Sequence, residues 1–115
     1  MTKPAHISQQ IWEMKYRLKG ADGQPVDKTM ADSWRRVARA LAGPEQDSSP
    51  WEQRFFDLLA DLKFLPNSPT LVNAGTGRGC LSACFVVSPD DDMESIMEVA
   101  HDAAMIEKWG GGIGF

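Results

Sequence analysis

Residues 81–87 read Leu-Ser-Ala-Cys-Phe-Val-Val and form the short apolar run on which the fold class of this chain depends. A run of this length after a glycine-rich approach predicts a β-strand. Odd-numbered side chains then point to one face, and even-numbered ones, including Cys84, point to the other. Apolar residues occur on both faces, which predicts an interior strand covered on both sides.

Helical segments precede the strand. Residues 7–18 form a candidate helix with fair periodicity, whose apolar positions are Ile11, Met14, Tyr16 and Leu18. A turn is expected at 20–25. Residues 33–42 show a clear helical period, and Asp32 or Ser33 is the expected cap.

The next helix is expected at 50–63, where Ser49 and Glu52 have the spacing of a capping box. The two helices are expected to form a small apolar core of large side chains: Trp34, Leu41, Trp51, Phe55, Leu59 and Leu62. Pro66 and Pro69 then predict an ordered loop over 65–70, and residues 71–80 are expected to stay loop-like.

A last helix is predicted from Asp91 or Asp92 to about Trp109. Asp91 and Glu94 have capping-box spacing, and Gly110 is expected to end the helix. Its predicted apolar side comprises Met93, Ile96, Met97, Ala100, Ala103 and Ala104. Residues 113–115 look like the beginning of another strand, but the strand at 81–87 has no evident partner. We therefore expect the front part of a larger protein, mainly α with a short β portion.

Composition sets the broad class. The chain has 115 residues, of which 43% are hydrophobic and 24% charged, as in ordinary globular domains. No apolar run approaches the ~18 residues of a membrane span, and no secretory signal is visible. Two cysteines are too few for a disulfide scaffold, so a cytoplasmic location is expected.

The charge is unevenly distributed. The net charge of −4 argues against a nucleic-acid-binding domain. Residues 1–43 nevertheless carry eight Lys and Arg against four acids, and residues 44–115 carry four against twelve. The basic first third could touch phosphates, or it could be a solvated helix face.

Few residues are candidates for chemistry by type alone. Cys84 is either a small buried hydrophobe or a thiol that faces a cavity. Cys80 lies four residues earlier, and the pair lacks the spacing and the histidines of a zinc site, so no metal site is expected. The glycines at 75–79 and 110–114 match no phosphate-loop or dinucleotide pattern. His6 and His101 are interpreted as surface or packing residues, and the acids at 90–92 as a helix cap.

Four ordered stretches carry a resemblance. They are Phe-Leu-Pro-Asn-Ser-Pro-Thr-Leu-Val-Asn-Ala-Gly-Thr at 64–76, Leu-Ser-Ala-Cys-Phe-Val at 81–86, Met-Glu-Ser-Ile at 93–96 and Gly-Gly-Gly-Ile-Gly-Phe at 110–115. In this order and spacing they closely resemble the N-terminal part of the class II, adenosylcobalamin-dependent ribonucleotide reductases. Residues 34–41 also resemble that family's helical leader.

The resemblance implies a fold and an activity. Residues 1–64 would form a helical N-terminal region, and residues 65–115 would begin a ten-stranded α/β barrel. The family converts ribonucleotides to 2′-deoxyribonucleotides for DNA synthesis and repair, by a thiyl radical that adenosylcobalamin initiates. Expected partners are the ribonucleotide substrate, a deoxynucleotide or ATP effector, a thioredoxin-type reductant, the rest of the barrel and a second subunit in a homodimer, with no membrane partner.

The resemblance also assigns residues. Cys84 matches the first cysteine of the reducing pair, which becomes a disulfide during the reaction. Ser68, Ala83, Cys84 and Gly112 match substrate-contacting positions, and Asp91 and Met93 match an effector-contacting stretch. Cys80 is not part of the family pattern. The radical cysteine, the cobalamin contacts and the C-terminal cysteines have no counterpart here, so the 115 residues are expected to be inactive alone.

Two other interpretations stay open at this point. A class I reductase large subunit shares the barrel but takes its radical from a partner protein. A non-catalytic helical module could instead use the basic region 1–43 and exposed tryptophans for protein contacts. Indifference of a folded, monodisperse chain to nucleotides would favour the latter.

Overall fold

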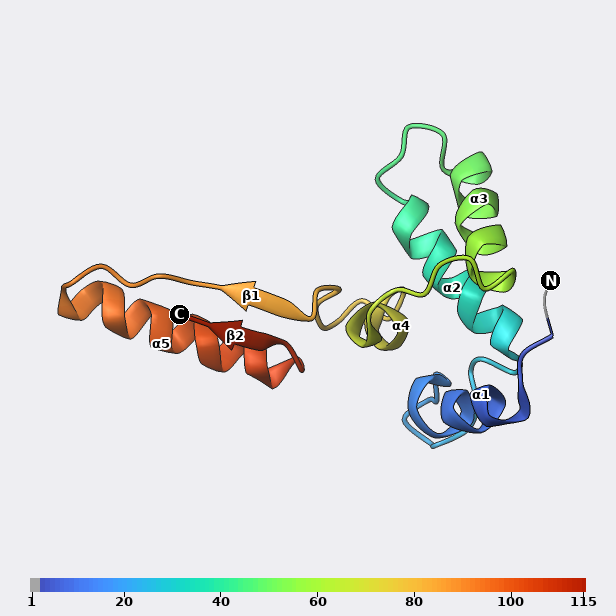
Figure 1. Ribbon diagram of the computed structural model, residues 1–115, viewed down its shortest axis with the longest axis horizontal. Coiled ribbons are helices and arrows are strands. Elements are labelled where there is room, and N and C mark those ends of the chain that lie inside the picture. The colour runs from blue at the N-terminus through green and yellow to red at the C-terminus, as the bar shows by residue number, and fades with distance from the viewer. Residues whose placement is uncertain (1–2) are drawn as a thin grey trace.

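The computed structural model describes residues 3–115, which form a helical lobe followed by a smaller β–α–β unit (Figure 1). The order of elements is α1 (His6–Ile11), a π-helical turn η1 (Trp12–Tyr16), α2 (Met30–Ala42), α3 (Ser48–Ala60), α4 (Ser68–Asn73), β1 (Cys84–Val86), α5 (Met93–Lys108) and β2 (Gly112–Gly114). The fold is therefore mainly helical, with two short strands, as predicted.

The first predicted helix is shorter than expected and presents a different face. It passes from α1 into the π-turn η1, where the N–H of Arg17 donates to the carbonyl of Trp12 at 2.9 Å. The wider turn changes which side chains face inward. Trp12 is buried, whereas Ile11 and Met14, which the periodicity placed on the apolar side, are exposed.

Helix α2 begins earlier than predicted, because its cap is Thr29 and neither Asp32 nor Ser33. The Thr29 hydroxyl accepts from the N–H of Asp32 at 3.3 Å, and the Asp32 carboxylate accepts from the N–H of Thr29 at 2.7 Å. This reciprocal pair is a capping box. The predicted apolar face is confirmed, since Trp34, Val37 and Ala38 are buried.

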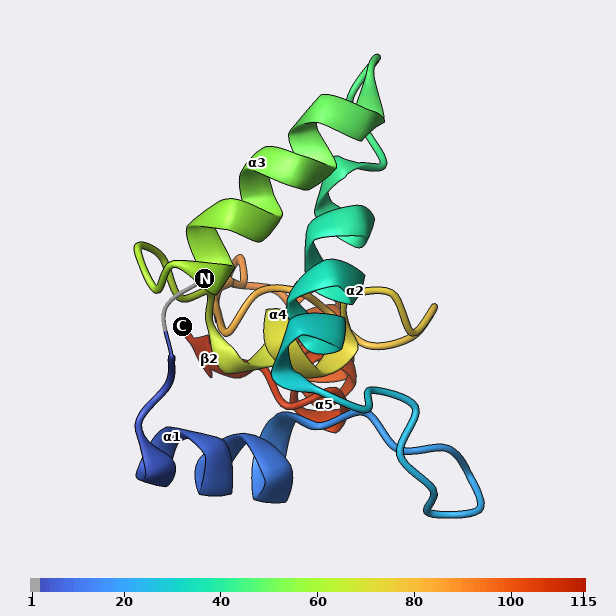
Figure 2. The same cartoon turned by 90° about the vertical axis from the view of Figure 1, so that its right-hand side faces the viewer.

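Helix α3 packs against α2 as an antiparallel hairpin (Figure 2). The predicted capping box at Ser49 is wrong. Ser49 lies inside the helix, the N-cap Asp47 makes no side-chain capping bond, and Glu52 instead pairs with Arg39 at 3.3 Å. Because Arg35 and Arg39 of α2 lie opposite Glu52, its carboxylate pairs with them across the hairpin and does not cap the start of α3.

The core of the helical lobe differs in part from the predicted set. It consists of Trp34, Val37, Leu59, Ala60, Leu71 and Ala74. Of the predicted set, Leu41 packs against this core, whereas Trp51 and Leu62 are 37% and 50% exposed. Leu71 and Ala74 come from a segment that is predicted to be loop, where no helical period points to a buried face.

That segment contains helix α4, which corrects the prediction of a loop over 65–70 and 71–80. Asn67 caps α4 by accepting from the N–H of Thr70 at 3.0 Å. Pro69 is the second residue of the helix, where a missing N–H costs no hydrogen bond. Pro66 lies before the cap, so neither proline prevents a helix that begins at Ser68.

Strand β1 has a partner, contrary to the prediction. It pairs in parallel with β2, with Cys84 opposite Gly112, Phe85 opposite Ile113 and Val86 opposite Gly114. It is also shorter than the predicted 81–87 run. Within residues 3–115 it is covered on one face only, because Phe85 is half-buried while Cys84 and Val86 are exposed.

Helix α5 is capped by Asp92, whose carboxylate accepts from the N–H of Ser95 at 2.8 Å. The predicted Asp91–Glu94 capping box is therefore wrong. The predicted apolar side is wrong for Met93, Ile96 and Met97, which are exposed, and right for Ala103, which is half-buried. Val99 and Ile106, which were not predicted, are half-buried on the same helix. Gly110 ends the helix as predicted, with a φ of +83°.

The molecule is elongated, with principal extents of 53 × 35 × 26 Å. Its radius of gyration is 17.0 Å, against about 13 Å for a compact domain of this length. Figure 1 shows the β–α–β unit extending away from the helical lobe, with α4 and the glycine-containing turn between them. None of the helices in residues 3–115 has the length and hydropathy of a membrane span.

Candidate functional site

Three of the predicted site residues come together where β1 meets β2. The N–H of Gly112 donates to the carbonyl of Ala83 at 2.7 Å, and Cys84 is the register partner of Gly112. The thiol of Cys84 lies on the strand face that points away from α5, and it is exposed. The alternation predicted from the sequence is therefore confirmed, with Cys84 on the exposed face of the strand.

The two cysteines are both free thiols. Cys80 is half-buried, and its Sγ lies 3.4 Å from the carbonyl oxygen of Ser82. Cys84 has no comparable contact among the described residues. Of the two, Cys84 is the thiol open to a reaction partner.

The glycines after α5 have different surroundings. A Cβ on Gly111 would lie 2.7 Å from Ile106 and 3.0 Å from the Phe85 ring, so only glycine allows β2 to approach β1 and α5 here. A Cβ on Gly112 would meet only the carbonyl of Ala83, at 3.5 Å. Gly111 closes the turn, and Gly112 leaves open space beside Cys84.

Ser68 is exposed at the start of α4, on the side of the helical lobe. Its hydroxyl lies 3.0 Å from the hydroxyl of Tyr16. The same helix is tied to the approach of β1. The hydroxyl of Thr70 donates to the carbonyl of Leu81 at 2.6 Å, and the amide of Asn73 donates to the carbonyl of Cys80 at 2.8 Å. Two side chains of α4 thus connect the Ser68 segment to the strand that carries Cys84.

Asp91 and Met93 lie elsewhere. They flank the start of α5, whose 16 residues span about 24 Å, whereas Gly112 follows its end. Met93 is 71% exposed, and Asp91 is exposed beside it. The structure therefore separates the two predicted effector residues from Cys84 and Gly112 by the length of the helix.

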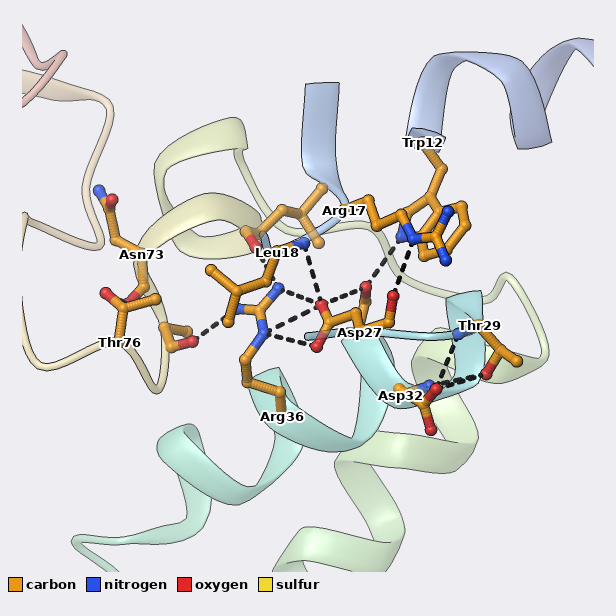
Figure 3. Close-up of polar contacts among 12 residues, drawn as sticks. Trp12, Arg17, Leu18, Asp27, Thr29, Asp32, Arg36, Asn73 and Thr76 are labelled. Atoms are coloured by element: carbon orange, nitrogen blue, oxygen red, sulfur yellow. Dashed lines mark hydrogen bonds and ion pairs between the residues drawn. The ribbon is translucent and has the colours of Figure 1, made fainter. Parts of the chain in front are cut away.

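The sequence did not point to the polar network at the base of the helical lobe (Figure 3). Asp27 is 3% exposed, and its carboxylate accepts from the guanidinium of Arg36 at 2.9 Å and from the hydroxyl of Ser33 at 2.6 Å. Arg36 also donates to the carbonyls of Ala74 at 2.6 Å and Leu71 at 3.1 Å.

This network joins α2 to the C-terminal part of α4, at Leu71 and Ala74. Asp27 and Arg36 are nine residues apart across the start of a helix, and no sequence spacing signals such a contact. The nearest signal is the Trp-Arg-Arg-Val stretch at 34–37, where an arginine adjoins the buried face of the helix.

The described residues provide no cluster of side chains for a metal ion. No group of three or more His, Cys, Asp or Glu in residues 3–115 could hold one.

The pKa of Asp32 is lowered from its ordinary value of 3.8, because the backbone N–H and the hydroxyl of Thr29 stabilise its carboxylate. That shift belongs to the helix cap and not to the site around Cys84.

Comparison with known families gives two adjacent matches. Residues 2–79 match the all-alpha domain of ribonucleotide reductase, and residues 82–115 match its barrel domain.

Comparison with individual proteins gives relatives of two kinds. The vitamin B12-dependent ribonucleoside-diphosphate reductase of Mycobacterium tuberculosis is 40% identical over 106 residues, which cover 88% of this chain and 15% of that protein. The corresponding protein of Thermoplasma acidophilum is 53% identical over 62 residues, covering 54% of this chain and 8% of its own length. The ribonucleoside-diphosphate reductase subunit alpha of Chlamydia muridarum is 43% identical over 81 residues, covering 70% of this chain and 8% of its own.

The chain thus spans 15% or less of the length of these relatives. The helical lobe corresponds to the first family match and the β–α–β unit lies within the second. With the all-alpha match alone covering more than half of its residues, the chain belongs to the ribonucleotide reductase family.

Proposed function

We propose that these residues are the N-terminal part of a vitamin B12-dependent ribonucleotide reductase, in which Cys84 is one of two reducing thiols. The observation that carries the proposal is the exposed thiol of Cys84 opposite Gly112 on a parallel strand pair. A thiol in this position can meet a nucleotide, because glycine leaves the neighbouring strand without a side chain.

The reaction has a simple balance. The ribose loses its 2′-hydroxyl as water, and two thiols supply two electrons and two protons as they become a disulfide. Cys84 would be one of these thiols; the second is not assigned to a described residue. Ser68, Ala83 and Gly112 would contact the substrate beside it, through a hydroxyl and backbone groups.

The uncovered face of the β–α–β unit supports a larger sheet. Val86, on the same strand face as Cys84, is 83% exposed, and Met93 and Phe115 elsewhere on the unit are also largely exposed. Apolar residues gathered on such a small unit indicate a surface that further protein covers. Both edges of a two-stranded sheet can accept another strand, as the start of a barrel requires.

The remaining partners of the proposed enzyme follow from the family. Adenosylcobalamin would supply the radical that starts the reaction. No contact with this cofactor is assigned to the described residues. A thioredoxin-type protein would reduce the disulfide, a deoxynucleotide or ATP would act as effector near Asp91 and Met93, and the complete protein would be a cytoplasmic homodimer.

A class I large subunit is the second candidate. The 43% identity to the Chlamydia muridarum subunit alpha favours it, since that protein matches this chain nearly as well as the B12-dependent relatives do. Both candidates use Cys84 in the same role, so the source of the radical separates them.

The test uses the enzyme expressed from the complete reading frame that contains these residues. We expect it to reduce CDP or CTP when supplied with adenosylcobalamin and a dithiol, and to be inactive without the cobalamin. Activity that requires a second protein subunit and no cobalamin would instead establish the class I candidate. No reduction under either condition would contradict the proposal.

The Cys84→Ser variant tests the residue assignment. It is expected to lose multiple turnovers, because the disulfide cannot form, while nucleotide affinity stays within about tenfold, or ~1.4 kcal/mol. Cys80→Ser is the matched control and should keep its turnover. Repeated turnovers by Cys84→Ser with a dithiol reductant would show that another group reduces the substrate.

A further inference from the structure

The hydroxyl of Ser68 has a partner from a distant part of the chain. The hydroxyl of Tyr16 lies 3.0 Å from it, although the two residues are 52 positions apart. Tyr16 is half-buried and Ser68 is exposed, so the tyrosine approaches from the protein side and leaves the serine open to solvent. Sequence patterns gave Tyr16 no role beyond packing.

The position of Tyr16 is fixed by its neighbours. It is the last residue of the π-turn η1, a feature that is frequent at functional sites. The indole of Trp12 donates to Ser33 at 2.8 Å, and the guanidinium of Arg17 donates to the carbonyl of Asp27 at 2.8 Å. Residues on both sides of the phenol are therefore attached to the Asp27 network.

The same network fixes the Ser68 segment from the other side. Arg36, held by Asp27, donates to the carbonyls of Leu71 and Ala74 in and after α4. The segment that carries Tyr16 and the segment that carries Ser68 are thus both hydrogen-bonded to the buried Asp27–Arg36 ion pair.

Either hydroxyl can donate to the other, and the two directions have different consequences for a ligand. A serine hydroxyl has one proton to donate and two lone pairs that accept. If Tyr16 donates to Ser68, the serine proton remains available to a ligand oxygen. A phosphate oxygen accepts hydrogen bonds strongly, and a chain of hydroxyls that ends on it is polarised along its length.

We infer that Tyr16 is a positioning residue, which orients the hydroxyl of Ser68 toward a phosphate group of the nucleotide substrate. The inference rests on the proposed function, since it requires Ser68 to contact substrate. It adds that this contact depends on a tyrosine of the helical lobe, outside the strands that carry Cys84 and Gly112.

The first measurement tests the contact. Tyr16 is the sole tyrosine of the 115 residues, so tyrosine labelled with ¹³C at Cζ gives a single resonance. Ser68→Ala is expected to shift that resonance, and the matched control Ser88→Ala, at another exposed serine, is expected to leave it unmoved. An unchanged resonance in Ser68→Ala would overturn the inference.

The second measurement tests the role in the enzyme from the complete reading frame. Tyr16→Phe keeps the ring and removes only the hydroxyl. We expect it to raise the KM for the nucleotide about fivefold with little change in kcat, which is the pattern of lost ground-state binding. In the Ser68→Ala background, Tyr16→Phe is expected to have no further effect.

The outcomes separate the inference from the proposed function. Equal effects of Tyr16→Phe with and without Ser68, or an unchanged KM with only a lower melting temperature, would show that Tyr16 is merely structural. If Ser68→Ala leaves the KM unchanged, Ser68 does not contact substrate, and both the proposed role of Ser68 and the inference are wrong. Loss of turnover in Cys84→Ser would still support the reducing role in that case.

Discussion

At the scale of single residues, Asp27 is a buried charged group that connects several segments of the helical lobe. Its carboxylate is buried and is satisfied by Arg36, Ser33 and the N–H of Leu18, the last at 3.4 Å. A buried charge is tolerated only when it is paired and hydrogen-bonded. Because Arg36 also holds two carbonyls of the α4 segment, this ion pair connects stability to the position of Ser68.

Substitution of Asp27 by Asn should therefore destabilise the chain strongly. The change keeps the size of the side chain but leaves the Arg36 guanidinium buried without its counter-charge, which costs about 3 kcal/mol of unfolding free energy. Urea unfolding, followed by tryptophan fluorescence, measures this. Glu45→Gln, at an exposed acid in the turn after α2, is the control and should stay within about 0.5 kcal/mol. A similarly small effect for Asp27→Asn would show that the ion pair contributes no net stability.

At the scale of elements, the start of α2 provides a pH-dependent contribution. The pKa of Asp32 is lowered by its hydrogen bonds with Thr29, so folding favours the charged carboxylate. A group whose pKa is lowered in the folded state adds stability above its unfolded pKa and loses it as pH falls through the folded one. The contribution of this cap is thus complete at neutral pH and disappears in acid.

We expect Asp32→Asn to cost about 0.5–1 kcal/mol at neutral pH, as the loss of a capping interaction does. The difference from the unmodified chain should shrink as pH falls below 3.8, the ordinary value for the carboxyl. Unfolding free energies across that range measure it. Asp47→Asn is the matched control, because Asp47 precedes α3 without a side-chain capping bond. A cost for Asp32→Asn that does not vary with pH would contradict this account.

The β–α–β unit should be less protected from solvent exchange than the helical hairpin. Each strand has three residues, and α5 has no buried side chain. An isolated strand pair of this size is marginal. Hydrogen exchange is expected to be slow at Val37 and Leu59 and fast over 84–86 and 112–114. Equal protection in both regions of a monomer would mean that the unit is stable without further protein.

At the scale of the whole molecule, the helical lobe and the β–α–β unit share few interactions. The described connections run through α4, where Thr70 and Asn73 hold the carbonyls of Leu81 and Cys80. Between them lies a turn whose glycines at 75, 77 and 79 all have positive φ. The core residues belong to the helical lobe, which accounts for the elongated shape.

A chain that ends at Gly79 should therefore keep most of the stability. It loses the two hydrogen bonds from α4, so its unfolding free energy should fall by no more than about 2 kcal/mol. Chemical denaturation with tryptophan fluorescence measures this, because Trp12 and Trp34 are buried in the retained part. The complementary chain 80–115 should show no cooperative transition. A truncated chain that does not fold would show that the β–α–β unit supports the helical core.

The sequence determined the elements whose signals are local. Neighbouring residues set the helical period of α2, the end of α5 at Gly110 and the alternation of side chains along β1. The sequence motifs of the family are local in the same sense. The family assignment followed from those motifs and is confirmed. Two further assignments stay predictions: the division of the chain at residue 64, and the roles of Ser68, Ala83, Cys84 and Gly112.

Only the tertiary structure decided the features that depend on contacts between distant segments. Glu52 turns to Arg39 of the neighbouring helix, whereas the Thr29 cap of α2 is a local contact with Asp32 that the sequence analysis missed. Residues 113–115 suggested a strand, but only the fold showed that β2 pairs with β1, through a helix that returns the chain. The Asp27–Arg36 pair and the Tyr16–Ser68 contact have no periodic signal, since each joins residues that the chain separates and the packed core brings together.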